Sequence, residues 1–234
     1  MGEMIEIEAL DGTGRFAAYR AAPSLAPTAA IIVIQEIFGV NAGIRRKADD
    51  WAAKGYLALA PDMFWRFAPG YDVDPDIAEQ AQDAFEVRKQ FDPDRGIMDV
   101  EACIRAARAA LGAGGGKVGV VGFCMGGRVA YLAATRTDTD ASVGYYGGMI
   151  DQSLGEAHAI ARPLMLHFAA DDAHITAEVR ASIHAALDGN AHVTIHDYAG
   201  VGHGFADTFG KRRSDAAARE ADARTDAFFA QALA

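Results

Sequence analysis

The fold is decided by the stretch Lys117-Val-Gly-Val-Val-Gly-Phe-Cys-Met-Gly-Gly-Arg-Val-Ala130. Its first part, residues 117–121, is rich in β-branched residues and is typical of a buried parallel strand. Its last part, residues 126–134, has the small residues of a closely packed helix. Between them, Gly122-Phe-Cys-Met-Gly126 has the G-x-C-x-G pattern of a nucleophile elbow, a tight strand-to-helix turn that projects a reactive side chain above the edge of a sheet.

Cys124 has two interpretations at this turn. A free cysteine is often a small buried core residue, and the glycines would then form an ordinary turn. As a nucleophile, Cys124 would benefit from the partial positive charge of the helix N-terminus behind it, which favours a thiolate and a developing oxyanion. The second interpretation predicts that an acid and a histidine follow downstream, in that order.

Composition limits the class of protein. The chain has 234 residues, of which 51% are hydrophobic and 23% charged, enough for one sizeable core and a single domain over residues 1–234. A formal net charge of −10 argues against a nucleic-acid partner, since such proteins present basic surfaces. Two cysteines, Cys103 and Cys124, are too few for a disulfide framework and fit a reduced cytoplasm.

The N-terminal segment carries no targeting pattern. Residues 1–8 alternate acidic and apolar side chains, with neither a basic region nor an apolar core of a signal peptide. No apolar run approaches the ~20 residues that a membrane-spanning helix needs. We therefore expect a soluble cytoplasmic protein without a membrane partner.

Strand and helix patterns alternate along the chain without linker composition between them. This predicts an α/β fold with a mostly parallel central sheet and helices on both faces. Residues 63–75 are expected to be loop, and 112–116 a glycine-rich hinge. The expected strands are 4–10 and 15–19 (an antiparallel hairpin), 29–34, 55–60, 117–121, 141–146, 163–168 and 191–198. The expected helices are 41–54, 76–90, 94–111, 126–134, 176–187 and 212–232.

Reactive residues follow four of these strands. Ligands in open α/β sheets bind beyond the carboxyl ends of the strands. Glu36 follows the strand 29–34, Cys124 the strand 117–121, an Asp171-Asp172 pair the strand 163–168, and His203 the strand 191–198. The order nucleophile, acid, histidine is that of α/β-hydrolases.

His203 is the best candidate base because it lies in a glycine-rich loop after the last strand. His174 is the competitor, but it stands beside the candidate acid. Asp172 is favoured over Asp171, since Asp172-Ala-His-Ile-Thr176 opens the next helix. With a thiol, the histidine would generate the thiolate and the carboxylate would fix the imidazole tautomer.

Three residues complete the predicted machinery. Glu36 is either a polar loop residue or a carboxylate that holds the Cys124 proton at rest and gives up its place when substrate enters. The backbone N–H groups of Ile37 and Met125 are the expected donors to an oxyanion.

The chain resembles the dienelactone hydrolase (carboxymethylenebutenolidase) family of the α/β-hydrolase superfamily, from about Ile31 to the C-terminal helix. The resemblance implies the α/β-hydrolase fold, a Cys124, His203 and Asp172 triad, and Glu36 as the group that activates the thiol. It also implies hydrolysis of a small-molecule lactone or ester without a metal or an organic cofactor. The residues that carry it are Gln35-Glu-Ile-Phe-Gly-Val-Asn41, Ala60-Pro-Asp62, Gly122-Phe-Cys-Met-Gly-Gly127, Tyr145-Tyr-Gly147, His167-Phe168 with Asp172, and Gly202-His-Gly-Phe205.

The chain departs from the family at the expected substrate clamp. Family members that act on chlorocatechol-pathway lactones grip the substrate carboxylate with two arginines, whose positions here are Ala81 and Asp207. Gly204 stands where a serine follows the catalytic histidine. An aspartate at such a clamp would repel a carboxylate. The chemistry is therefore expected to carry over, while the substrate differs.

Substrate contacts are predicted for Phe38, Arg66 and Tyr145. Arg66 is the nearest substitute cation, although loop arginines usually face water. A monomer or a small homo-oligomer is expected.

Three rival functions follow from the same sequence. A family hydrolase acting on a neutral or otherwise non-dienelactone ester is favoured by Ala81 and Asp207. A non-catalytic binding module would be expected from an incomplete set of catalytic residues, whereas all members are present. A thiol redox protein is disfavoured, because the chain has no C-x-x-C pattern and Cys103 lies in a helix.

Overall fold

The structure is a computed structural model that describes residues 2–112 and 114–234. Ala113, in the expected 112–116 hinge, lies outside the described residues. The chain forms two compact units, Met1–Gly119 and Val120–Ala234, and each is described by itself. The single domain expected from composition stays a prediction.

The first unit is built on four strands in the order β1-β2-β4-β3, followed by the start of β5. The β1–β2 and β2–β4 pairs are antiparallel, and β3 pairs with β4 in parallel through Ala30 and Leu57. All six residues of β3 are buried, as its continuous apolar sequence predicts for a strand covered on both faces. The strands are β1 (Glu3–Glu8), β2 (Arg15–Ala21), β3 (Ala29–Ile34) and β4 (Leu57–Pro61).

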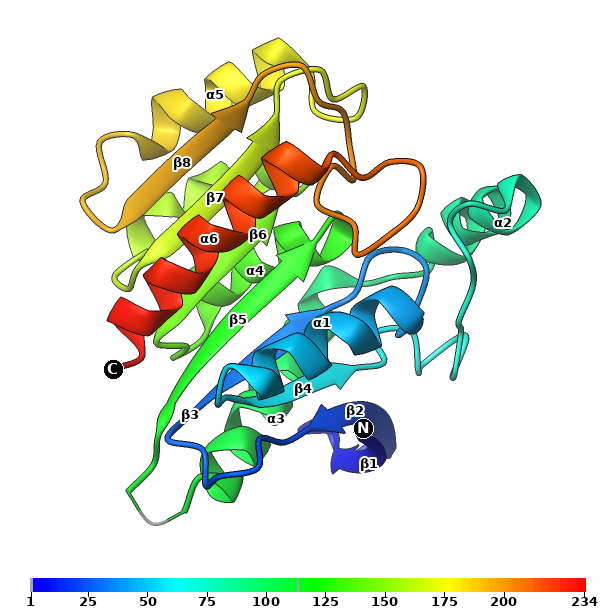
Figure 1. Cartoon of the computed structure of the whole chain (residues 1–234), viewed down its shortest axis with the longest axis vertical. Helices are drawn as coiled ribbons and strands as arrows, with labels where there is room; N and C mark the ends of the chain where they lie inside the picture. The colour runs from blue at the N-terminus through cyan, green and yellow to red at the C-terminus, as the bar shows by residue number, and fades with distance from the viewer. Residues whose placement is uncertain (1, 113) are drawn as a thin grey trace. The chain divides into compact units, whose positions relative to one another are not determined.

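Three helices belong to this unit: α1 (Ala42–Ala53), α2 (Ala78–Arg88) and α3 (Pro93–Ala110). Helices α1 and α3 lie on opposite faces of β3 and β4 (Figure 1). Asn41 caps α1 by accepting the N–H of Ile44 at 3.1 Å. Asp92 caps α3 by accepting the N–H of Asp94 at 2.9 Å.

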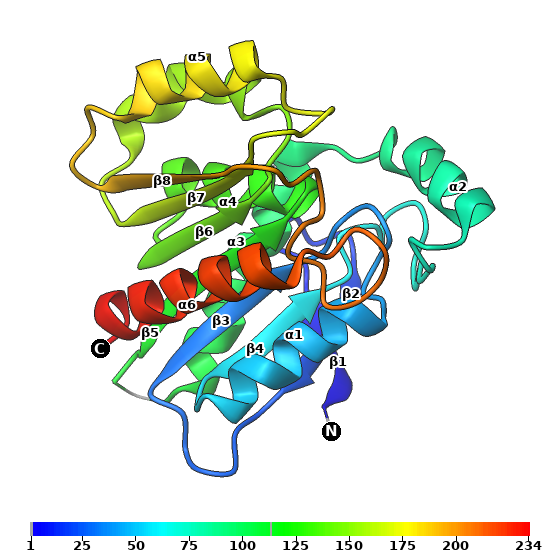
Figure 2. The same ribbon diagram turned by 45° about the horizontal axis from the view of Figure 1, so that its top comes forward.

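The second unit has its strands in the order β5-β6-β7-β8. The β6–β7 and β7–β8 pairs are parallel, through Ser142 with Leu164 and Leu164 with Val193. Helix α4 packs against one face of β6, and α6 packs against the opposite face of β6 and β7 (Figures 1 and 2). The strands are β5 (Lys117–Phe123), β6 (Ala141–Tyr145), β7 (Leu164–Ala169) and β8 (Val193–Tyr198); the helices are α4 (Met125–Arg136), α5 (Ala177–Leu187), α6 (Asp215–Ala232) and the 3₁₀ helix η1 (Ile150–Ala159).

Two segments differ from the expectations. The 3₁₀ helix η1 was not predicted, since its short polar sequence has neither a strand nor an α-helix period. Residues 63–75 form a loop as expected, but Met63 and Phe64 are buried and thus belong to the core of the first unit. Within the described residues, no helix has the length and apolar character to cross a membrane. The cytoplasmic location stays a prediction.

Candidate active site

Cys124 occupies the turn between β5 and α4 and is partly exposed. Its backbone is strained, with φ of 54° and ψ of −114°. Its N–H donates to the carbonyl of Tyr145 at 3.0 Å, which ties the turn to the end of β6. A Cβ on Gly122 would collide with the backbone carbonyl of Gly126, so the turn requires glycine there. This is the strand–turn–helix geometry that the G-x-C-x-G pattern predicts.

Asp172 and His203 are joined by a short polar contact. Asp172 Oδ2 and His203 Nδ1 lie 2.7 Å apart, and the Asp172 side chain has no exposed surface. The other carboxylate oxygen accepts the backbone N–H of His174 at 2.8 Å. Asp171 is exposed, and its backbone N–H donates to the carbonyl of Val201. The structure thus brings Asp172, and not Asp171, to the histidine.

The charge of each partner favours the ionised form of the other. Burial alone would raise the pKa of Asp172, but the His203 hydrogen bond and charge, with the N–H of His174, lower it. Burial alone would lower the pKa of His203, but the charge of the Cys124 thiolate and the hydrogen bond to Asp172 raise it to about 11. The imidazolium form of His203, beside the Asp172 carboxylate, is therefore favoured at neutral pH.

Cys124 and His203 lie close together in the second unit. The Cys124 sulfur and a ring nitrogen of His203 lie within 4.8 Å of each other. His203 Nε2 is buried and has no hydrogen-bond partner of acceptable geometry among the described residues. The thiol and the imidazole are thus close enough for the charge on one to act on the other.

Met125 follows Cys124 directly and is the first residue of α4. The first N–H groups of a helix have no acceptor within the helix and carry its partial positive charge. Met125 therefore has the position that the predicted oxyanion donor requires, and the role itself stays a prediction.

Glu36, Ile37 and Phe38 lie in the first unit, in the loop after β3, and all three are buried. The buried side chain of Gln35 holds this loop by accepting the N–H of Met63 at 3.1 Å. The carbonyl of Phe38 accepts the N–H of Val73 at 3.1 Å. The loop is thus fixed by the segment after β4, while the catalytic and substrate roles of the three residues stay predictions.

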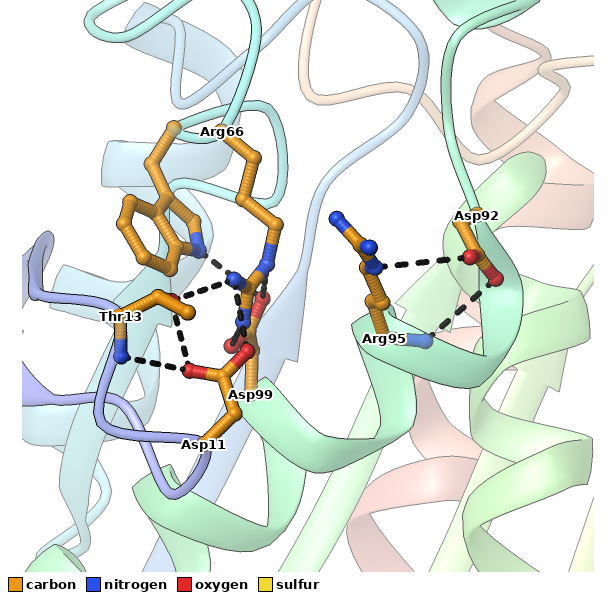
Figure 3. Close-up of polar contacts among 7 residues, drawn as sticks. Asp11, Thr13, Arg66, Asp92, Arg95 and Asp99 are labelled. Carbon is orange, nitrogen blue, oxygen red and sulfur yellow. Dashed lines mark hydrogen bonds and ion pairs between the residues drawn. The ribbon is translucent and has the colours of Figure 1, made fainter.

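Arg66 has a set of partners that the sequence did not indicate (Figure 3). Its guanidinium contacts Asp99 at 2.8 Å, Asp11 at 2.9 Å and the Thr13 hydroxyl at 2.8 Å, and it stacks on Trp65. The side chain is only 14% exposed. These contacts tie the β1–β2 turn to α3. They give Arg66 a structural role and lend no support to the predicted substrate contact, which stays a prediction.

Tyr145 and Cys103 are both deeply buried. The Tyr145 hydroxyl lies 3.1 Å from an Asp222 carboxylate oxygen and 2.6 Å from the Thr225 hydroxyl, so it is held by α6. Its predicted substrate contact has no support from these partners.

Burial raises the pKa of the Cys103 thiol well above its usual value, which argues further against a redox function.

Asp207 is paired with a cation and with a tyrosine hydroxyl. Its Oδ2 lies 2.6 Å from Arg212 Nη2, and its Oδ1 accepts from the Tyr146 hydroxyl at 3.3 Å. The ion pair with Arg212 offsets the negative charge of Asp207, which was expected to repel an anionic substrate. The Lys211-Arg212-Arg213 run was the available signal for this pair.

Known proteins resemble this chain over most of its length. The family model of the dienelactone hydrolase family matches residues 16–233. A candidate carboxymethylenebutenolidase of Azospirillum brasilense is 41% identical, over 94% of this chain and 95% of its own length. The carboxymethylenebutenolidase of Pseudomonas putida is 37% identical, over 88% and 86% respectively.

The solved structures give the same result for the fold. The crystal structure of a candidate dienelactone hydrolase from Klebsiella pneumoniae matches with a TM-score of 0.87 and 26% identity, covering 99% of this chain and 98% of that one. The predicted α/β-hydrolase fold is thereby confirmed. On its sequence and its fold, the chain belongs to the dienelactone hydrolase family.

Proposed function

We propose that the protein hydrolyses a lactone or a small activated ester, with Cys124 as nucleophile, His203 as acid and base, and Asp172 as the group that orients the imidazole. The observation that carries the proposal is the arrangement of the three side chains in the second unit. A short Asp172–His203 contact holds a charged imidazole near a cysteine at a strained elbow. Strained residues with a matched acid–base partner are typical of catalytic sites.

The proposed reaction has two halves. The Cys124 thiolate attacks the carbonyl carbon and forms a C–S bond, while the N–H groups of Ile37 and Met125 stabilise the oxyanion. The C–O bond to the leaving group then breaks, and the His203 imidazolium supplies the proton. Water attacks the resulting thioester, and neutral His203 takes a proton from it. The C–S bond breaks and returns the thiolate and the imidazolium, so the sum is ester plus water to acid plus alcohol.

Glu36 remains part of the proposal on the strength of the family resemblance. It is a buried carboxylate in the loop after β3. Its proposed role is to hold the Cys124 proton in the resting state and to give up its place beside Cys124 when substrate enters. Neither a metal nor an organic cofactor takes part in the proposed steps.

Two substrate classes are compatible with this chemistry. Relatives such as that of Pseudomonas putida are named carboxymethylenebutenolidases, which supports a lactone that bears a carboxylate. A neutral ester is the second candidate. It is favoured by Ala81, because a residue on α2 without a charge contributes nothing to anion binding.

A substrate panel separates these classes. We expect turnover of p-nitrophenyl acetate and of dienelactone, with the neutral methyl ester of dienelactone hydrolysed at least as well, in kcat/KM, as the free carboxylate. The physical reason is that, without an ion pair to the substrate carboxylate, the enzyme has no preference for the anion. Each 1.4 kcal/mol of lost interaction free energy corresponds to about a tenfold loss of that preference. Steady-state rates at constant ionic strength give the ratio. A preference for the free carboxylate of 100-fold or more would contradict the neutral-ester candidate, and no turnover of any member would favour a binding module.

A further inference from the structure

Tyr146 is a strained residue that the proposed mechanism does not use. Only Cys124, Tyr146 and Met149 among the described non-glycine residues have a positive φ, and Tyr146 has a φ of 38°. Such a backbone conformation is unfavourable for a non-glycine residue and persists where surrounding contacts enforce it. Cys124 and Tyr146 follow the carboxyl ends of the neighbouring strands β5 and β6. The strain at Cys124 belongs to the elbow, whereas that at Tyr146 requires its own explanation.

The side chain of Tyr146 is fully buried against the loop that carries the candidate base. Its ring centroid lies 5.0 Å from that of His203 and 5.5 Å from that of Phe205. Its hydroxyl donates to Asp207 at 3.3 Å. Its backbone N–H donates to the carbonyl of His167 at 2.7 Å, which fixes the strained turn to β7. One side chain from the end of β6 therefore touches three residues of the segment 203–207.

Two arginines that follow in the sequence also bind this loop. Arg212 pairs with the Asp207 carboxylate at 2.6 Å, and Arg213 donates to the Asp207 backbone carbonyl. The N–H of Ser214 donates to the carbonyl of Phe205 at 2.9 Å. These contacts make the segment 203–214 rigid. The position of His203 therefore depends on the contacts that Tyr146 makes with this segment.

A single hydrogen bond does not fix the imidazole. The hydrogen bond to Asp172 fixes the position of Nδ1 in the His203 ring. The ring can still rotate about the line that joins Nδ1 to Asp172 Oδ2. Such rotation would move Nε2 away from the Cys124 sulfur. The Tyr146 ring, inclined at 59° to the imidazole, and the edge-on ring of His174 at 4.9 Å restrict that rotation.

We propose that Tyr146 is a positioning residue, whose ring holds the His203 imidazole so that Nε2 faces the Cys124 sulfur. This inference rests on the proposed function, since it assigns a partner to the same three residues. Proton transfer depends steeply on geometry, and a displacement of about 1 Å can lower a rate by 100-fold. The strained backbone at Tyr146 is thus explained by this role. The chain leaves the extended conformation of β6 there, which directs the Tyr146 ring towards His203.

The test compares two buried tyrosines of the second unit. Tyr146→Leu is expected to lower kcat for p-nitrophenyl acetate by tenfold or more with KM within threefold. It is also expected to lower the rate of Cys124 alkylation by iodoacetamide at pH 6 by tenfold. Tyr131→Leu is the matched control, because Tyr131 is equally buried and its hydroxyl donates to the Ser153 carbonyl at 3.2 Å. That control should lower Tm similarly while Cys124 alkylation stays near the wild-type rate.

Two further variants complete the test. Tyr146→Phe keeps the ring and is expected to retain kcat within about threefold, and Tyr146→Met replaces Tyr146→Leu should the latter not fold. Equal changes in alkylation for the Tyr146→Leu and Tyr131→Leu proteins would overturn the inference, as would a loss in Tyr146→Phe as large as in Tyr146→Leu. Alkylation does not require hydrolysis, so these outcomes are distinguishable from failure of the proposed function, which retained activity in Cys124→Ala would reveal.

Discussion

Cys124→Ala is expected to lower kcat/KM for p-nitrophenyl acetate by at least about 1,000-fold. The nucleophile forms the C–S bond on which both halves of the proposed reaction depend. Without it, only the oxyanion donors and the binding surface remain, and these supply a small residual rate. Alanine fits the space of cysteine, so Tm should stay close to that of the wild-type protein. Initial rates at matched protein concentration, with Tm from thermal unfolding, measure both quantities.

Cys103→Ala is the matched control for this variant. Cys103 is fully buried in α3 of the first unit, so it shares the chemistry of Cys124 but has no access to substrate. Its substitution should leave kcat/KM within about twofold while lowering stability modestly, as removal of a buried group does. Retention of more than a tenth of the activity in Cys124→Ala would exclude the nucleophilic mechanism.

His203→Gln is expected to lower kcat by about 10,000-fold, the upper end of what general acid–base catalysis contributes. Glutamine cannot carry the proton to the leaving group or take one from water. The imidazolium charge that stabilises the Cys124 thiolate is also lost, so alkylation by iodoacetamide at pH 6 should slow by tenfold or more. Steady-state kinetics and alkylation rates on the same preparation give the two results.

His196→Gln is the control for this second variant. His196 lies in β8, and its ring stacks on His167 at 5.6 Å, away from the catalytic contacts. Its substitution should leave kcat within about threefold. If His196→Gln and His203→Gln lost activity equally, the loss would reflect disturbance of the fold and not removal of the base.

The raised pKa of His203 adds a dependence of stability on pH. The folded pKa of about 11 lies above the usual value of 6.5. The imidazolium therefore contributes stability that is fully present below about pH 6.5 and lost as the pH rises through about 11. His203→Gln should accordingly lower the free energy of unfolding more at pH 6 than at pH 10, as urea unfolding would measure. An equal effect at both values would contradict the charged pair.

Local sequence was sufficient for the elements that carry the candidate site. The strand at 29–34 and the helices at 41–54 and 94–111 were each predicted to within a few residues, because strand burial and helix capping depend on neighbouring residues. The elbow was predicted from spacing alone, since glycine at residue 122 and a strand–helix junction leave few other conformations. The family match also confirms the predicted hydrolase family.

Contacts between distant residues were not predictable in this way. These contacts depend on the tertiary fold, which brings segments together in a way that a single sequence does not reveal. The examples are Arg66 with Asp99, Asp207 with Arg212, and Tyr146 with His203. The choice of Asp172 over Asp171 was predicted from the helix that follows, and the 2.7 Å contact to His203 agrees with it. The catalytic roles, the oligomeric state and the cytoplasmic location stay predictions.

The most direct measurement is rapid-quench mass spectrometry of the wild-type enzyme during turnover of p-nitrophenyl acetate. The proposed mechanism predicts an acetyl group on the peptide that contains Cys124, formed at the rate of the p-nitrophenol burst and absent from Cys124→Ala. It further predicts that His203→Gln, once acylated, retains the acetyl group, because no base activates water. Full turnover without any acylated Cys124, or acylation at another residue, would contradict the central claim.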